Sequence, residues 1–146
     1  MPTYTVNYSN FTINKNKKKE IALGITKIHK LVTGANSFFA QVIFSNNKKN
    51  NHFMGGKKVK GKQIFLEGKI RSGRSKRIKL RLITSLRDIL TKTTEITKDN
   101  VWVYLIDLPP KQMIEYGEIL PDSGKEKIWF SRLPKNLKNK LKKIDT

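Results

Sequence analysis

The hydrophobic and polar positions in the first half of the chain predict a strand, a helix and a second strand. Residues 2–8 alternate between small or polar residues and large apolar ones, which indicates a strand that begins at the second residue. From about residue 14 to residue 33, apolar residues recur at intervals of three and four, which indicates a helix that Gly34 ends. Residues 38–46 predict a second strand, and the polar, glycine-containing stretch 46–62 predicts a loop.

The second half repeats this order of elements without repeating the sequence. Residues 63–70 predict a strand, residues 73–94 a helix with its apolar residues on one face, and residues 101–107 another strand. Two prolines then interrupt the strand, and residues 112–117 predict a helical turn. The last residues, 133–146, are rich in lysine and predict a basic tail.

These elements predict an α/β fold made of two βαβ units. A strand, helix and strand in that order form a right-handed crossover between parallel strands. Two units therefore give a four-stranded, mainly parallel sheet with both helices on one face. The strands at 38–46 and 101–107 are apolar at consecutive positions, as in strands buried on both faces, so copies of the chain are expected to cover the other face. We expect one domain at 1–132, with βαβ units at about 2–46 and 63–107 and a C-terminal segment at 108–132, followed by the tail at 133–146.

Composition narrows the class of protein. The 146 residues fit a single domain. The absence of cysteine excludes disulfides and thiolate metal sites, and two histidines are too few for a histidine-rich metal site. No stretch approaches the roughly 18 apolar residues of a membrane span, and the N-terminal region lacks the apolar run of a signal peptide, so we expect a cytoplasmic protein.

The charge of the chain is strongly positive. Its formal net charge is +20, from 31 lysines and arginines against 11 aspartates and glutamates. A basic protein attracts nucleic acid, acidic lipid or small carboxylates. The abundance of Lys, Asn and Ile also follows from AT-rich coding without any selection for binding, so only basic residues at constrained positions point to a function.

Pro2 is the first candidate for chemistry. Removal of the initiator methionine before a small residue would leave a secondary amine, and α-amino groups titrate at roughly 7.7–8.0. Most prolines at this position have no function. Here, however, the predicted strand begins directly at Pro2, which would hold the amine in place, whereas most chain termini are mobile.

Arg71 and Arg74 lie where the third predicted strand passes into the second predicted helix. Ser72 could cap that helix, and cations are unfavourable at a helix N-terminus, so an anion bound between the arginines would remove the conflict. The arginine fork suits a carboxylate. The alternatives are an ordinary surface pair, or one end of a phosphate-binding stripe that continues through the basic residues at 76–81.

Three further side chains would not stand out alone. His29 lies near the edge of the apolar face of the first predicted helix, where histidine is usually structural. Tyr104 lies in an apolar strand, and Glu115 lies in a polar turn.

The chain resembles the cis-3-chloroacrylic acid dehalogenase family of the tautomerase superfamily. The similarity runs from residue 2 to about residue 130 and is carried by the stretches PTYTVNYS, IHKLVTG, FFAQVIF, FMGG, IFLEGKIRSGRS and VWVYLIDLPPKQMIEYGEILP. That family has six catalytic residue types in a fixed order, and the matching residues here are Pro2, His29, Arg71, Arg74, Tyr104 and Glu115. The resemblance implies a homotrimer that needs no cofactor. The chain departs from the family pattern in the lysine-rich loop 48–60 and in the basic tail.

The resemblance also implies roles for these residues. Arg71, Arg74 and His29 would bind the carboxylate of a small unsaturated acid and draw electron density toward it. Glu115, assisted by Tyr104, would activate a water that attacks the β-carbon.

In the same scheme, protonated Pro2 would give its proton to the α-carbon. A carboxylate at Glu115 would favour the ammonium form of Pro2. We therefore expect hydration or dehalogenation to exceed keto–enol tautomerase activity.

Two other functions compete with this hydratase hypothesis. One is a basic, non-catalytic binding module for nucleic acid or a protein partner, supported by the charge but by no nucleic-acid motif and no aromatic stacking platform evident in the sequence. The other is an inactive family member that acts through protein contacts. Nothing in the sequence indicates a membrane partner.

Overall fold

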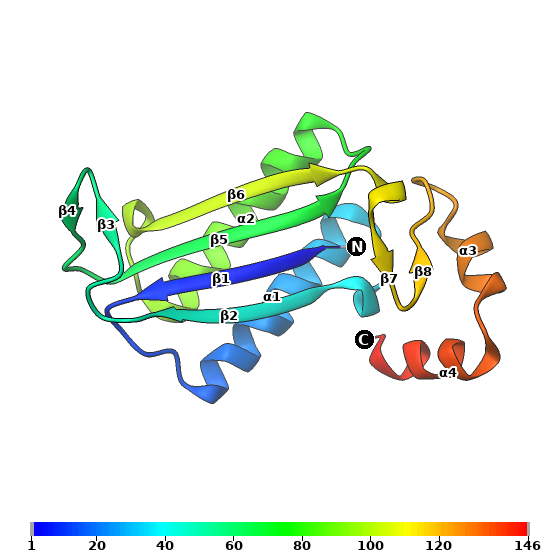
Figure 1. Cartoon of the computed structure of the whole chain (residues 1–146), viewed down its shortest axis with the longest axis horizontal. Coiled ribbons are helices and arrows are strands. Elements are labelled where there is room, and N and C mark those ends of the chain that lie inside the picture. Colours follow the sequence, from blue (N-terminus) through cyan, green and yellow to red (C-terminus); the bar gives the residue numbers. More distant parts are fainter. Residues whose placement is uncertain (1, 146) are drawn as a thin grey trace.

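Four long strands form one sheet in the computed structural model, which describes residues 2–145 (Figure 1). Their order is β2-β1-β5-β6; β1 pairs parallel with β2, β5 pairs parallel with β6, and the central pair β1 and β5 is antiparallel. The sheet is therefore mixed but mainly parallel, as predicted. The bounds are Thr3–Ser9 for β1, Gln41–Asn47 for β2, Gln63–Arg71 for β5 and Val101–Leu108 for β6.

Two long helices cross between the parallel strands and cover one face of the sheet, which confirms the two βαβ units (Figure 1). Helix α1 spans Lys15–Thr33, and helix α2 spans Lys76–Thr94. Gly34 ends α1 in the left-handed conformation, as expected. Ser72 does not cap α2. The cap is Ser75, whose extended backbone lets its hydroxyl accept from the amide of Ile78.

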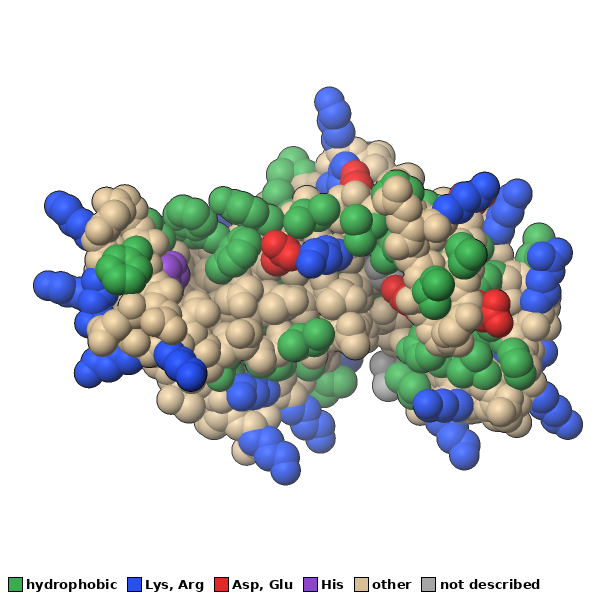
Figure 2. All heavy atoms as spheres, in the orientation of Figure 1, with side chains coloured by type: hydrophobic (Ala, Val, Ile, Leu, Met, Phe, Trp, Pro, Cys, Tyr) green, Lys and Arg blue, Asp and Glu red, His purple; other side chains and the backbone are tan. Residues whose placement is uncertain are grey.

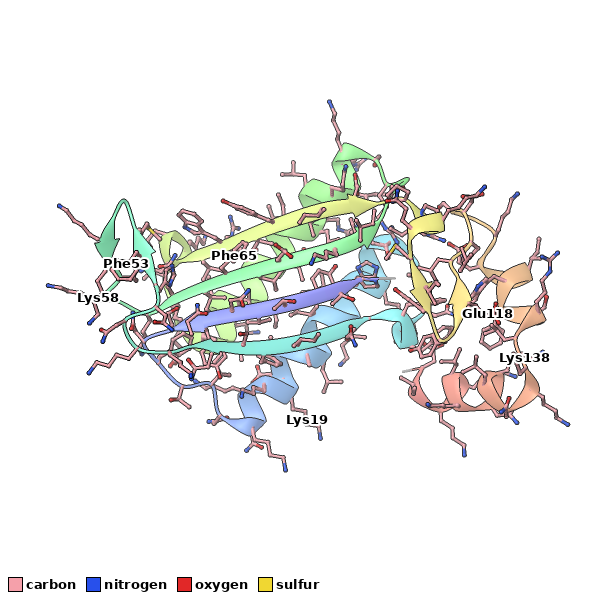
Figure 3. The ribbon with its side chains drawn as sticks, viewed as in Figure 1. Lys19, Phe53, Lys58, Phe65, Glu118 and Lys138 are labelled. Atoms are coloured by element: carbon pink, nitrogen blue, oxygen red, sulfur yellow. The ribbon has the colours of Figure 1, made fainter. Side chains whose placement is uncertain are left out.

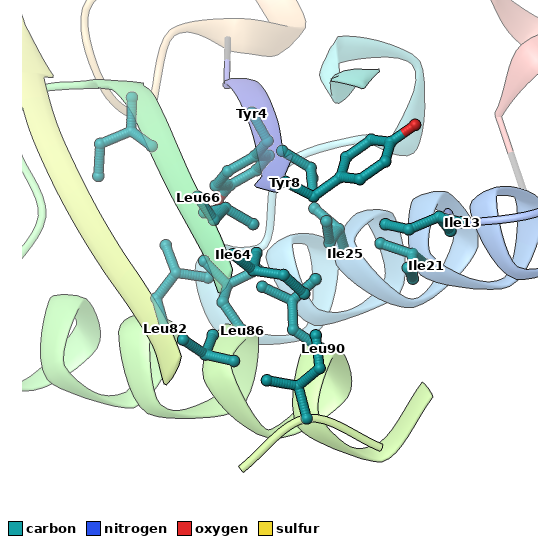
Figure 4. Close-up of a cluster of buried hydrophobic side chains, with 14 residues drawn as sticks. Tyr4, Tyr8, Ile13, Ile21, Ile25, Ile64, Leu66, Leu82, Leu86 and Leu90 are labelled. Atoms are coloured by element: carbon teal, nitrogen blue, oxygen red, sulfur yellow. The ribbon is translucent and has the colours of Figure 1, made fainter. Parts of the chain in front are cut away.

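The main core lies between the sheet and the two helices (Figure 4). Alternate residues of each strand point toward the helices, as the period of a strand requires. Tyr4 and Leu66 are fully buried there, and the buried side chains of α1 and α2 meet them from the other side. The helical contribution is Ile21, Ile25, Leu82, Leu86 and Leu90.

The opposite face of the sheet is open in the single chain. Trp102 and Tyr104 of β6 are 42% and 52% exposed, and Ile43 of β2 is 46% exposed. Figure 2 shows apolar side chains on this face, whereas lysines and arginines project mainly around the rim. The sequence had indicated strands buried on both faces; within one chain only the helical face is covered.

The predicted loop at 46–62 contains a small hairpin. Strand β3 spans Phe53–Met54 and β4 spans Lys57–Lys58. The strand expected at 38–46 begins only at Gln41, because Ser37–Phe39 form a 3-10 turn that buries both phenylalanines.

The helical turn predicted at 112–117 is wrong. After a 3-10 turn at Pro110–Gln112, the chain forms a second hairpin from β7 (Ile114–Glu115) and β8 (Glu118–Ile119). The turn residues Tyr116 and Gly117 have φ values of 56° and 84°, which no right-handed helix adopts.

Two short helices complete the fold, α3 at Glu126–Arg132 and α4 at Lys135–Ile144. Leu141 of α4 is fully buried in a second apolar cluster together with Phe38 and Phe39. Residues on both sides of the expected boundary at 132 therefore share one cluster, and the division into domain and tail stays a prediction. Lys138 of α4, labelled in Figure 3, donates to the carbonyl of Ser131 in α3 at 3.1 Å.

Candidate active site

The start of β1 and the end of β5 lie at the same edge of the sheet. Thr3 pairs with Lys69 in the antiparallel ladder, so Pro2 and Arg71 lie just beyond that pair. Pro2 is buried, and its carbonyl accepts from the amide of Gln41 at 3.0 Å. In Figure 1 the β7–β8 hairpin and α3 stand at this edge. The strand pairing therefore holds Pro2 in place, as the sequence predicted.

A cavity of about 540 Å³ opens at this edge, and both arginines line it. Arg71 is only 2% exposed; it donates to the carbonyl of Pro121 at 2.7 Å and forms an ion pair with the carboxylate of Glu126. Arg74 donates to the carbonyl of Arg71 at 2.6 Å. The Nε atoms of both arginines are buried without a partner among residues 2–145. The arginines retain donors that a bound anion could take up.

The turn between β5 and α2 directs the second guanidinium into the cavity. Gly73 has a φ of 105°, which a side chain would rarely tolerate, and Arg74 comes directly before the capping residue of α2. Burial, and then the charge of Arg71, lower the pKa of Arg74. Positive charge is thus concentrated at a helix N-terminus, where an anion is favoured.

His29 lies near the arginines but is buried within the fold. It is 1% exposed, and its Nδ1 lies 2.7 Å from the hydroxyl of Tyr4. Burial, followed by the positive charge of Arg74, lowers the pKa of His29 to about 3, so the ring is neutral at physiological pH. Its Nε2 is buried and has no hydrogen-bond partner in the described part of the chain.

Glu115 lines a cavity next to the arginine cavity. This second cavity, of about 590 Å³, is also lined by Thr3, the residue that follows Pro2. Phe38 and Phe39 line both this cavity and the arginine cavity, so the two cavities are neighbours at the sheet edge.

The hydroxyl of Tyr116 donates to the carbonyl of Phe38, which attaches the β7–β8 hairpin to the 3-10 turn at Ser37–Phe39. Glu115 is consequently held at the same sheet edge as Pro2. It does not share a cavity with Arg71 and Arg74.

Tyr104 is not brought to this edge within one chain. It pairs with Glu67, whereas Leu108 pairs with Arg71, so Tyr104 lies four residues back along the strand, roughly 13 Å at 3.3 Å per residue. It lines a separate hollow of about 460 Å³ on the open sheet face with Trp102 and Phe65.

A family profile described as "Putative oxalocrotonate tautomerase enzyme" matches residues 1–132. The chain belongs to this tautomerase family. Among solved structures, it is similar to N1, a member of the cis-3-chloroacrylic acid dehalogenase family, with 29% identity, a TM-score of 0.92, and coverage of 97% of this chain and 99% of that one. The resemblance inferred from the sequence is thereby confirmed.

More distant similarity supports the fold. A fused 4-OT described as a symmetric trimer has 16% identity and a TM-score of 0.73, and the alignment covers 81% of this chain and 94% of that one. A protein inactivated by 2-oxo-3-pentynoate has 21% identity, the same TM-score and the same coverage. No curated protein matches the chain.

Two residues that contact the candidate site residues are not indicated by the sequence. The sequence pattern indicates that Tyr4 is part of the strand at 2–8, and it assigns no role to Glu126. Tyr4 is 25 residues from His29 and Glu126 is 55 residues from Arg71, so no local spacing indicates either pair.

Three aromatic rings also lie together on the open sheet face, a grouping that the sequence did not indicate. Trp102 and Tyr104 stack with ring centroids 6.4 Å apart, and Phe65 meets Tyr104 edge-on at 5.0 Å. The rings come from neighbouring strands, and alternation along each strand places them on one face.

Residues 2–145 contain no group of three or more His, Cys, Asp or Glu side chains placed to hold a metal ion. No helix in the same range is both long and apolar enough to cross a membrane.

Proposed function

We propose that this tautomerase-family chain is a cofactor-independent enzyme that adds water to a small α,β-unsaturated carboxylate, with Pro2 as the general acid. The observation that carries the proposal is the convergence of Arg71 and Arg74 in one cavity at the sheet edge where β1 begins. Two guanidinium groups with unpaired Nε donors suit a carboxylate. Similarity to a member of a family named for cis-3-chloroacrylic acid dehalogenase gives further support.

The arginines would bind the carboxylate and withdraw electron density from the conjugated double bond. This makes the β-carbon electrophilic, because charge that develops on the carboxylate side is stabilised by fixed positive groups. His29 would contribute through its Nε2, which is buried close enough to Arg74 to sense its charge.

Water would then add across the double bond. Glu115 would accept a proton from the water as its oxygen bonds to the β-carbon, and the ammonium form of Pro2 would deliver a proton to the α-carbon. With a halogen on the β-carbon, the adduct loses hydrogen halide and gives malonate semialdehyde. An alkynoic acid such as propiolate gives the same aldehyde through its enol.

In this scheme a carboxylate at Glu115 would favour the protonated form of Pro2 by opposite-charge attraction. Glu115 and Thr3, the residue next to Pro2, line one cavity, which supports this pairing. A tautomerase that uses proline as a base needs the unprotonated amine, so tautomerase activity should be the weaker one.

The proposed enzyme is a homotrimer. The open sheet face exposes Ile43, Trp102 and Ile106, and a second copy of the chain would cover such a face. Several structures with the same fold are described as trimers. Tyr104 lies too far from Arg71 in its own chain, so it would assist Glu115 of a neighbouring copy.

The first test is a turnover assay with cis-3-chloroacrylate and propiolate, in which the aldehyde product is measured. We expect activity in the natural chain and a loss of at least a hundredfold in Pro2→Ala and Arg74→Ala. The first replaces the rigid secondary amine by a primary amine, and the second removes one carboxylate ligand. Arg87→Ala is the matched control, because Arg87 is paired with Asp88 on the surface of α2. Mass spectrometry must show that Met1 is removed, since retained Met1 makes the Pro2 nitrogen an amide.

A mixing experiment tests the shared site. Tyr104→Phe and Arg74→Ala proteins, each inactive, should regain partial activity when their subunits are exchanged. Sedimentation should give three times the mass of the chain. A protein that turns over neither acid but binds DNA in a salt-dependent manner would instead be the basic binding module.

A further inference from the structure

The pair formed by Tyr4 and His29 is enclosed by the core, near enough to Arg74 for the charge of that residue to act on both side chains. Tyr4 is fully buried, His29 is 1% exposed, and the hydroxyl lies 2.7 Å from Nδ1. Their rings meet edge-on with centroids 5.8 Å apart. Thr33, one turn after His29, lines the cavity. We propose that Tyr4 is a positioning residue that holds His29 as the Nε2–H tautomer, so that a neutral imidazole can donate to the substrate carboxylate.

The hydrogen bond between the two side chains can be made in only two ways. If the imidazole donated from Nδ1, the hydrogen of the Tyr4 hydroxyl would be buried without an acceptor, because His29 is its one hydrogen-bond partner among residues 2–145. Burying a hydrogen-bond donor without an acceptor lowers the stability of the fold. If Tyr4 donates instead, its hydrogen is satisfied, Nδ1 accepts, and the ring proton must reside on Nε2.

The environment of the ring leaves the choice of tautomer to Tyr4. Burial and the charges of Arg74 and Arg71 lower the pKa of His29, so the ring stays neutral and carries one proton. The hydroxyl of Tyr4 is the hydrogen-bond partner that the described residues offer to Nδ1. Without it, neither ring nitrogen has a partner in the described part of the chain, and the ring can adopt both tautomers.

The sheet provides a place for the Tyr4 ring. Gly68 is its cross-strand partner, and a Cβ at that position would lie 2.6 Å from Cε1 of Tyr4 and 2.8 Å from its Cδ1. The ring can lie over the bare Cα of Gly68 and reach His29. A residue with a side chain there would displace it.

The Nε2–H tautomer matches the ligand of the proposed function, on which this inference rests. A carboxylate only accepts hydrogen bonds. A protonated Nε2 can donate to it, whereas an unprotonated Nε2 presents a lone pair that repels it. Because the imidazole stays neutral, it adds a donor to the arginine pair without adding a third positive charge.

Nitrogen-15 NMR of the histidine rings tests the tautomer directly, since the chain has only His29 and His52. A His52→Gln protein assigns the signals. We expect the natural chain to show a protonated Nε2 and an unprotonated Nδ1 for His29, and Tyr4→Phe to show a mixture of the two tautomers. Ser9→Ala is the matched control, because it removes the hydroxyl that lies 2.8 Å from Nδ1 of His52. It should leave His29 unchanged.

Kinetics and ligand binding test the consequence. In Tyr4→Phe we expect KM for cis-3-chloroacrylate to rise roughly tenfold while kcat changes far less, because the lost donor serves carboxylate binding. Propionate, which cannot react, should shift the Nε2–H signal less in Tyr4→Phe than in the natural chain.

The two proposals can fail separately. An Nδ1–H tautomer in the natural chain, an unchanged tautomer in Tyr4→Phe, or an unchanged KM despite a mixture of tautomers would overturn the role of Tyr4. A propionate-dependent shift in a protein that turns over no unsaturated acid would support it and reject the proposed reaction.

Discussion

The guanidinium of Arg71, at the end of β5, forms an ion pair with the carboxylate of Glu126 at the start of α3, although the two residues are 55 positions apart. Arg71 also donates to the carbonyl of Pro121, so two of its bonds go to the segment that leads into α3. Burial alone would raise the pKa of Glu126, but the hydrogen bond and charge of Arg71 outweigh burial and lower it. This segment therefore holds Arg71 in place at the cavity.

Replacing Glu126 with Gln should lower the free energy of unfolding by roughly 1–3 kcal/mol at neutral pH, because the buried Arg71 loses its anionic partner. A carboxyl with a lowered pKa in the folded state stabilises the protein above its unfolded pKa and loses that contribution as the pH falls through the folded value. The difference between natural chain and variant should thus be full above pH 4.5 and shrink in acid. Urea titrations of both proteins at neutral pH and well below pH 4.5 measure this difference. A difference that does not change with pH would contradict the pairing.

Stability should also fall in mild acid because of His29. Its pKa is lowered from 6.5 to about 3 in the folded protein, so below 6.5 the unfolded chain binds a proton that the folded chain excludes. Above the unfolded pKa, His29 is neutral in both states and costs no stability. Between roughly pH 7.5 and pH 5, the free energy of unfolding should fall by about 2 kcal/mol. Denaturant unfolding of the natural chain and of His29→Gln measures this. The His29→Gln protein should not show this loss of stability between roughly pH 7.5 and pH 5, whereas the His52→Gln protein should.

Gly68→Ala should destabilise the fold by about 1–3 kcal/mol, because the added methyl group would press on the ring of Tyr4 and on Leu105 at 2.8 Å. Gly61→Ala is a matched control, since Gly61 has no positive φ and nothing lies within 4 Å of its added Cβ. Thermal unfolding of the two variants distinguishes crowding from the general effect of removing a glycine. Equal stabilities would mean that the Tyr4 ring has room to move.

Leu141→Ala should cost about 2–5 kcal/mol, because Leu141 of α4 is fully buried against Phe38 and Phe39. Ile144→Ala, on the same helix but 44% exposed, should cost about 0.5 kcal/mol or less. Calorimetry compares the two. A neutral Leu141→Ala would mean that residues 133–146 behave as the separate basic tail that the sequence predicted.

The sequence predicted the frame of the molecule well. The helices at 15–33 and 76–94 and the strands at 63–71 and 101–108 follow from local periodicity, because each buries one stripe or one face against a single core. The region after residue 108 was predicted poorly. Its hairpin depends on left-handed residues such as Tyr116, and local preferences do not indicate that conformation for a tyrosine.

By itself the sequence determined which residue types are available for chemistry: an early proline, an arginine pair, one helical histidine. Tertiary structure decided which of them meet. Antiparallel pairing of β1 with β5 brings Pro2 to Arg71, while parallel pairing of β5 with β6 keeps Tyr104 four residues away from the same edge. The bonds from Tyr4 to His29 and from Glu126 to Arg71 arise in the same way, because strand register and helix packing, rather than distance along the chain, determine which buried polar groups can satisfy one another.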